Sequence, residues 1–289
     1  MNKIMYFADA TCDLPQEFIK SRNIQLLGLR YAIGETEGWY TSANKEQLKE
    51  FYTKMRKGDT ASTSLVLYDD AITAFEPFFK DGYDIIHFGL SSGLAKTYEN
   101  ALNAGNDLAK KYGRKFYAPD TKCVSAMNIF IIDKCMKLEK EYSDLADGFE
   151  KIAEELPKLY NRVQAYFTVE NLKYLNKSGR LSDSAKLVGN FLNIKPIIIC
   201  EKKEGKLVTY TKKLGRLTSI QYLSSIVANI DPSSNDIFII HADCPNDAKM
   251  LEQKVRKRIK NAKIQVVELG FIIGTHTGPG TIGLGFIGK

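Results

Sequence analysis

Short apolar runs alternate along the first half of the chain with stretches whose apolar residues recur every three or four positions. The runs predict strands over residues 3–7, 24–30, 83–90 and 114–120. The wider spacing predicts helices that begin near Pro15 and that cover 45–57, 69–80 and 98–112. Strands that alternate with helices are typical of βαβ units, so we expect a largely parallel sheet with flanking helices.

The pattern changes near residue 160. Helices are predicted over 122–141 and 144–160, and the end of the second, a charged segment with a proline, indicates a domain junction. A strand over 162–169 and an antiparallel hairpin around Glu204-Gly205 follow it. The rest of the pattern predicts a helix over 216–229, a strand over 237–242, a basic helix over 249–260 and a strand over 262–269.

We therefore expect an α/β protein of two domains. The first covers residues 1–160 with a largely parallel sheet, and the second, smaller and mixed, covers 161–280, with residues 281–289 free to return to the first. A chain of 289 residues with 44% hydrophobic content is long enough for two cores. The crevice between two domains is the usual place for a ligand.

Composition narrows the functional classes. No apolar run reaches about 20 residues, and Asp9 interrupts the first run before a signal-peptide core forms, so we expect a cytoplasmic protein. Five cysteines without C-x-x-C spacing favour free thiols over disulfides or zinc. The net charge of +7 comes partly from the helix 249–260, whose basic face either meets water or docks transiently on a membrane surface or an acidic protein. No nucleic-acid-binding pattern accompanies it.

The C-terminal stretch 271–286 holds His276 between two apolar runs and matches G-x-G-x-x-G at Gly278, Gly280 and Gly283. That dinucleotide fingerprint opens a helix whose N-terminus binds pyrophosphate, and an acidic residue follows about twenty positions later. Neither a helical pattern nor an acidic residue follows here, and no Walker-type motif occurs elsewhere. We expect no nucleotide cofactor.

Ser91 lies at the centre of a G-x-S-x-G segment, Gly89–Gly93, between a predicted strand and a predicted helix, as a nucleophile elbow requires. Asp243 and His276 would complete the chain order of a serine hydrolase or esterase. Against this, no HGGG-like oxyanion segment precedes Ser91, and the second half lacks a run of parallel βα units. Two alternatives stay open for Ser91 and Ser92: a simple helix cap, or hydroxyls that bind an anion.

A second hydroxyl-rich cluster favours anion binding. Thr63 and Ser64, together with Ser91 and Ser92 at a helix N-terminus, have the donors to bind a carboxylate or a phosphate. Taken alone, the cluster around Thr63 is more typical of a solvated loop.

Three further polar residues have two interpretations each. Arg180, in a Ser-Gly-Arg turn before a helix predicted over 184–192, either binds a carboxylate or phosphate or lies on the surface. His241, near Asp243 and Cys244, lacks a second spaced ligand pair, which favours a strand end over a metal site. His87, inside an apolar strand, is expected to be a core histidine. No metal site is expected.

Six segments, in order along the chain, resemble motifs of the DegV family, whose members include the fatty-acid-binding subunits of bacterial fatty acid kinase. Together they cover essentially the whole chain, and their order makes the resemblance specific. The segments are ADATCDLP (8–15), TSL (63–65), LSSGLAKTYENA (90–101), PDTKCVSAMN (119–128), LNKSGRLS (175–182) and GTHTGPGTIGLGF (274–286).

The resemblance implies two α/β domains with a long-chain fatty acid in a tunnel between them. It implies a carboxylate-binding group at Thr63, Ser64, Ser91 and Ser92, and a pocket mouth that faces the kinase at Arg180, Thr275, His276 and Thr277. It also implies a carrier without catalytic residues or a cofactor, apart from the bound acid. A separate catalytic subunit of the fatty acid kinase would phosphorylate that acid with ATP, giving an acyl phosphate for phospholipid synthesis.

Two short segments depart from the family motifs. Val66 and Leu67 replace a Pro-Ser pair, which leaves the geometry of the loop after Thr63 open. Ala95 and Lys96 replace a Ser-Gly pair. The lysine either brings a charge to the head-group end of the pocket or points outward.

Overall fold

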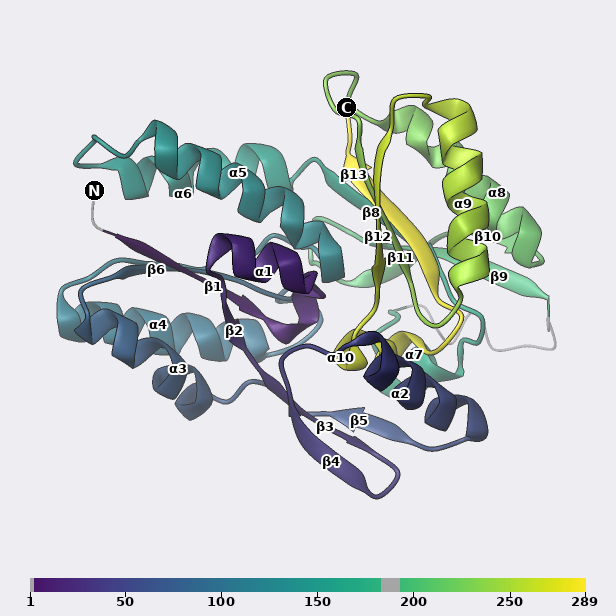
Figure 1. The fold of residues 1–289 in the computed structure, drawn as a ribbon, viewed down its shortest axis with the longest axis horizontal. Coiled ribbons are helices and arrows are strands. Elements are labelled where there is room, and N and C mark those ends of the chain that lie inside the picture. Colours follow the sequence, from purple (N-terminus) through teal and green to yellow (C-terminus); the bar gives the residue numbers. More distant parts are fainter. Residues whose placement is uncertain (1–2, 183–192) are drawn as a thin grey trace.

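The computed structural model describes residues 3–182 and 193–289. Their strands form sheets of four, six and three strands, and helices cover the two larger sheets (Figure 1). The mixed α/β class predicted from the sequence is confirmed. The helix predicted over 184–192 lies outside the described residues.

The four-stranded sheet is parallel throughout, in the order β2, β1, β6, β7. Its strands are β1 (Ile4–Asp9), β2 (Gln25–Leu27), β6 (Asp84–Phe88) and β7 (Phe116–Tyr117). Every residue of β1 and β6 is buried, because helices cover both faces (Figure 1). One face carries α3 (Tyr68–Lys80) and α4 (Thr97–Tyr112), and the other carries α1 (Gln16–Arg22), α5 (Asn128–Glu141) and α6 (Gly148–Tyr160). The predicted parallel sheet with flanking helices is confirmed.

The six-stranded sheet is mixed, in the order β10, β9, β8, β13, β11, β12. Only β11 and β12 pair in parallel among its described strands. The strands are β8 (Val163–Thr168), β9 (Ile194–Cys200), β10 (Leu207–Leu214), β11 (Asp236–His241), β12 (Lys263–Glu268) and β13 (Ile282–Ile287). Strands β9 and β10 form the predicted hairpin around Glu204-Gly205.

Strand β13 corrects one expectation. Residues 281–289 do not return to the parallel sheet, because β13 pairs antiparallel with β8 and β11 in the middle of the six-stranded sheet. Its glycines allow this close packing: a Cβ at Gly283 would lie 2.5 Å from Phe167 Cβ, and one at Gly285 would lie 1.9 Å from Met127 Sδ. The glycine-rich pattern is therefore that of a crowded central strand.

Helices α8 (Arg216–Ile226) and α9 (Pro245–Arg258) pack side by side on one face of this sheet (Figure 1). Helix α9 buries Ala248, Leu251 and Val255 against the sheet side, and most of its lysines and arginines lie at the surface. Within the described ranges, no helix has the length and apolar character needed to cross a bilayer.

The third sheet is small and antiparallel, and the sequence pattern did not reveal it. It contains β3 (Leu29–Ile33), β4 (Thr36–Tyr40) and β5 (Ala61–Thr63). The single strand predicted over 24–30 breaks at Gly28, where a Cβ would lie 2.1 Å from Trp39 Nε1. A bulky residue there would push the indole out of place.

Three helices join the three-stranded sheet to the rest of the molecule. Helix α10 (Phe271–Thr277), from the far end of the chain, packs against β3, β5, α2 (Lys45–Lys57) and α7 (Lys173–Ser178). The Asn44 side chain caps α2. Helix α10 thus connects the C-terminal half to the N-terminal half.

Candidate functional site

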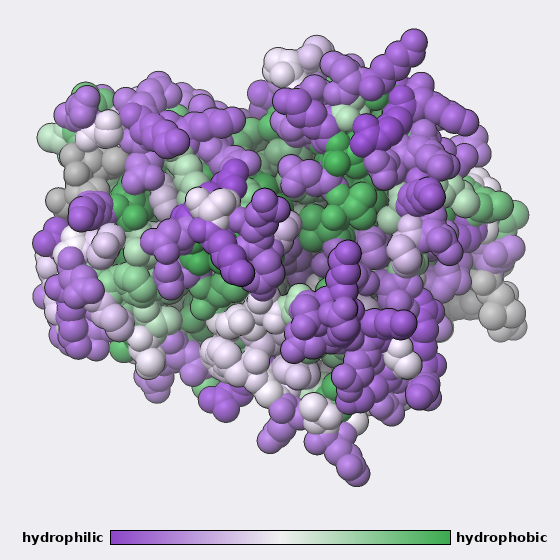
Figure 2. Space-filling view, in the orientation of Figure 1, coloured by the Kyte–Doolittle hydropathy of each residue, from purple (hydrophilic) through white to green (hydrophobic). Residues whose placement is uncertain are grey.

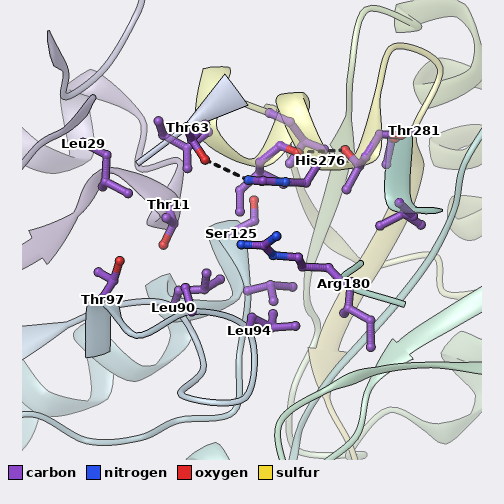
Figure 3. A pocket seen from close by; sticks show the side chains of 18 of the residues that line it. Thr11, Leu29, Thr63, Leu90, Leu94, Thr97, Ser125, Arg180, His276 and Thr281 are labelled. Carbon is purple, nitrogen blue, oxygen red and sulfur yellow. Dashed lines mark hydrogen bonds between the residues drawn. The ribbon is translucent and has the colours of Figure 1, made fainter. Parts of the chain in front are cut away.

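A cavity lies where the three sheets meet α10. Its wall takes residues from both halves of the chain, from Thr11 to Thr281 (Figure 3). Counting the part that opens to solvent, its empty space is about 820 Å³.

Most of the wall is apolar. The N-terminal half contributes residues of β3, of the segment after β5 and of the loops that follow the parallel strands, a usual place for ligands in such sheets: Leu29, Leu65, Leu90, Leu94 and Val124. The C-terminal half contributes residues of its sheet, of α7 and of α10: Phe167, Leu175, Leu207, Ile240, Leu269, Ile272 and Ile273. Such a wall suits a ligand with a large apolar part.

Three polar side chains meet at one place on this wall. Thr63 Oγ1 lies 2.9 Å from His276 Nε2, and the guanidinium of Arg180 lies beside them (Figure 3). The other ring nitrogen, His276 Nδ1, is buried and has no hydrogen-bond partner among the described residues. The structure therefore brings together three of the residues singled out from the sequence.

The electrostatics of this cluster favour an anionic ligand. Burial and the nearby positive charge of Arg180 lower the pKa of His276 to about 4, so the ring is neutral at neutral pH. A neutral imidazole has one donor and one acceptor nitrogen. Together with the Thr63 hydroxyl and the guanidinium, it can bind an acid group with several hydrogen bonds and a single full positive charge.

Contacts at the N-terminal end of α10 fix the position of the helix that carries His276. Asp13 accepts a hydrogen bond from the backbone N–H of Gly270 at 2.9 Å, and the Tyr52 hydroxyl donates to the Leu269 carbonyl at 2.7 Å. A Cβ at Gly274 would lie 2.3 Å from that hydroxyl. The helix is thus fixed against the N-terminal half, and a glycine is needed where Tyr52 crosses it.

Two carboxylates lie behind the cavity wall, the buried Asp9 and the half-buried Asp13. Asp13 accepts from Ser125 Oγ at 2.6 Å, and Asp9 accepts from both the N–H (2.9 Å) and the hydroxyl of Thr11. Burial raises the pKa of both carboxyls, that of Asp13 to about 7. Thr11 and Ser125 belong to the wall. Motifs compared above contain them, but a motif does not show which side chains face a cavity.

Local hydrogen bonds occupy the hydroxyls of Ser64, predicted to bind the carboxylate, and of Thr275 and Thr277, predicted at the mouth. Ser64 and Thr277 belong to the cavity wall, and their hydroxyls donate to the carbonyls of Leu65 (3.2 Å) and Ile273 (3.1 Å). Thr275 Oγ1 donates to a backbone carbonyl of its own helix. Thr275 lines an outer cleft, which shares Thr63, Arg180 and His276 with the cavity.

Ser91 and Ser92 are not brought to the cavity, and their predicted place beside Thr63 is corrected. The fully buried Ser91 donates to the Gly205 carbonyl at 2.8 Å, at the tip of the β9–β10 hairpin. Ser92 donates its backbone N–H to Asp120 at 3.1 Å, and its hydroxyl pairs with Asp120 and accepts from Lys122 at 2.7 Å. Ser91 thus fastens the hairpin tip to the N-terminal half, whereas Ser92 binds residues within that half.

The same contacts separate the members of the serine hydrolase arrangement. Ser91 donates to a backbone carbonyl, whereas the His276 ring pairs with Thr63. Asp243 forms an ion pair with Arg56 at 2.6 Å. No hydrogen bond joins Ser91, His276 and Asp243 in the described part of the chain.

The other histidines lie in strands. His87 is buried in β6, where burial alone lowers its pKa to about 3, as a core histidine should behave. His241 ends β11 and is buried as well. Across residues 3–182 and 193–289, no three His, Cys, Asp or Glu side chains come close enough to hold a metal ion.

The two departures from the family motifs have different surroundings. Lys96 is exposed and is absent from the wall, whereas Ala95 belongs to it. Val66 is fully buried and donates its N–H to Thr97 Oγ1 at 3.2 Å. The lysine therefore brings no charge into the cavity.

Comparison with known proteins places the whole chain in one group. The family model described as "Uncharacterised protein, DegV family" matches residues 3–289. A DegV domain-containing protein of Clostridium perfringens is 31% identical over 100% of this chain and 98% of its own length. A solved fatty acid binding DegV family protein from Streptococcus agalactiae has a TM-score of 0.85 at 23% identity over 100% of both chains. A DegV family protein from Eubacterium eligens loaded with heptadecanoic acid has a TM-score of 0.83 at 17% identity, over 99% and 100% of the two chains.

Proposed function

Because the chain belongs to the DegV family, we propose that its cavity binds a long-chain fatty acid and that the protein presents the carboxylate to a separate kinase. The observation that carries this proposal is the composition of the wall. The wall is mostly apolar, and Thr63, Arg180 and His276 form on it a cluster suited to an acid group. Solved proteins of the same fold that bind fatty acids support it.

The energetics of such a ligand fit the wall. Burial of an acyl chain gains roughly 0.8 kcal/mol per methylene, or on the order of 10 kcal/mol for a long chain before the costs of binding. A carboxylate taken from water needs several donors. Thr63, Arg180 and the neutral His276 have them, and Thr277 and Ser64 lie nearby on the wall. We therefore expect the acid to stay bound during purification.

The outer cleft supports the presentation of the carboxylate to a partner. It shares Thr63, Arg180 and His276 with the cavity, and Lys173 and Lys177 also line it. A kinase subunit docked there would reach the carboxylate from outside, and the lysines would attract ATP phosphates. The chain has no Walker-type motif of its own, so ATP binding and phosphoryl transfer are assigned to the partner, and the product is an acyl phosphate for phospholipid synthesis.

The carrier would work in the cytoplasm and exchange its ligand at the membrane surface. The exposed basic side chains of α9 are the proposed contact with anionic lipid. No catalytic residue, metal or cofactor of the chain itself is required.

Mass spectrometry of the purified protein under denaturing conditions tests the binding step. A fatty acid released in about equimolar amount supports the proposal, and its absence, together with no uptake of added acid, contradicts it. Incubation of the loaded protein with a fatty acid kinase catalytic subunit and ATP tests the second step through acyl phosphate formation. Labelling of Ser91 by a fluorophosphonate would instead favour a hydrolase.

A further inference from the structure

Two buried hydroxyls in the cavity wall have no part in the Thr63, Arg180 and His276 cluster. Thr11 follows β1 and Thr97 begins α4, and each is 1% exposed. Both line the cavity, and in the view of Figure 3 their oxygens face one another with Leu29 and Leu90 on either side. Polar groups in such surroundings need a partner.

The Thr11 hydroxyl can only accept from a ligand. It donates its single proton to Asp9 Oδ1, which also accepts the Thr11 N–H at 2.9 Å. The second carboxylate oxygen accepts the Leu90 N–H at 3.1 Å, and a Cβ at Gly89 would lie 2.4 Å from it. Asp9 is thus held on both sides, and Thr11 presents only lone pairs to the cavity.

The Thr97 hydroxyl has the opposite character. Its oxygen accepts the Val66 N–H at 3.2 Å, and its proton has no acceptor among the described residues. It can therefore donate into the cavity. One acceptor and one donor thus line the same cavity, and in Figure 3 they face one another.

We infer that Thr11 and Thr97 recognise a hydroxyl group on the acyl chain, so that the cavity prefers a long-chain hydroxy acid. This inference rests on the proposed function. An alcohol donates one hydrogen bond and accepts others, so it satisfies Thr11 and Thr97 at once. A plain methylene leaves the lone pairs of Thr11 and the proton of Thr97 without a partner in the cavity, and sites built for a hydroxyl discriminate against the analogue that lacks it.

Competition binding to delipidated protein tests this inference. The probes are hexadecanoic acid and a panel of hexadecanoic acids that each carry one hydroxyl at a different carbon. One position, or two adjacent ones, should bind about tenfold more tightly than the other isomers, because only that hydroxyl reaches both threonines. Comparing isomers with one another cancels the cost of removing the hydroxyl from water.

Two variants test whether the Thr11 hydroxyl causes the preference for one hydroxyl position. Thr11→Val removes the acceptor with little change in shape and should abolish the preference, whereas Thr11→Ser keeps the hydroxyl and should preserve it. Equal affinity for all isomers, or a preference that survives Thr11→Val, would overturn the inference while tight binding of hexadecanoic acid leaves the proposed function standing. If no acid binds, both fail. If Thr11→Val does not fold, the affinities of the wild-type protein for the different isomers test the inference by themselves.

Discussion

Thr63 and His276 lie 213 positions apart in the chain, yet Thr63 Oγ1 is 2.9 Å from His276 Nε2. The first residue ends a short strand of the three-stranded sheet, and the second lies on α10. Their contact therefore forms only when α10 packs on the N-terminal half. A ligand that binds both residues should stabilise that packing, since it binds the folded state alone.

Thr63→Val should weaken fatty-acid retention about tenfold or more, because a buried carboxylate and the His276 ring both lose a hydroxyl partner. Displacement of a fluorescent fatty acid from the delipidated variant measures the change. Ser62→Ala, at the exposed neighbouring position of β5, is the matched control and should bind like the wild type. Unchanged retention in Thr63→Val would remove this residue from the head-group cluster.

His276 predicts how stability depends on pH. Its pKa is lowered from 6.5 to about 4 in the folded protein by burial and by Arg180, so its contribution to stability is present above pH 6.5 and is lost as the pH falls toward 4. The free energy of unfolding of the wild type relative to His276→Gln should fall by roughly 3 kcal/mol across that window. Urea unfolding of the delipidated proteins at several pH values measures it, and parallel curves would contradict it.

Asp13 predicts the opposite trend. Burial raises its pKa from 3.8 to about 7, so its contribution is fully present below pH 3.8 and is lost as the pH rises toward 7. Asp13→Asn keeps an oxygen to accept from Gly270 and should gain stability relative to the wild type as the pH rises from 4 to 7. Thermal unfolding at matched pH values measures the difference, and Asp81→Asn, at an exposed turn, should show no such trend.

The sequence predicted the strands of the parallel sheet because their apolar runs carry the signal of burial locally. It did not predict α10, whose Gly-Thr-His-Thr segment has low helix propensity. Contacts with Asp13 and Tyr52, more than two hundred positions away, stabilise that helix instead. No periodicity within 271–286 contains that information.

The candidate site, like the fold, was predicted only in part from the sequence. Residue type identified hydroxyls and cations able to bind an anion, and three of these residues, Thr63, Arg180 and His276, meet at the cavity. Residue type could not show that the Ser91 hydroxyl donates its hydrogen bond to the Gly205 carbonyl, 114 positions away. The direction of a buried side chain depends on the neighbour that the fold supplies.

Ser91→Ala should lower stability rather than ligand affinity. The Gly205 carbonyl would lose its hydroxyl donor in a buried place and keep only the weak Cys200 thiol donor at 3.3 Å, at a cost of about 1–3 kcal/mol. We expect a lower thermal midpoint with fatty-acid affinity within about twofold of the wild type, the reverse of the result for Thr63→Val. A large loss of affinity without loss of stability would return Ser91 to the binding site.

The outer cleft predicts a separation between ligand binding and phosphorylation. Lys173 and Lys177 line it but do not belong to the inner wall. Lys173→Glu combined with Lys177→Glu should therefore leave retention of the acid unchanged, and should reduce acyl phosphate formation by the kinase about tenfold or more, because repulsion opposes docking and the approach of ATP.

The matched control is a pair of charge reversals on α9, Lys249→Glu and Lys254→Glu, which changes the net charge equally on another face. If the loss comes from docking at the cleft, the control pair keeps full phosphorylation, and raising the kinase concentration restores the rate of the cleft variant. If both pairs lose activity equally and in proportion to ionic strength, the effect comes from overall charge, and the cleft is not where the kinase binds.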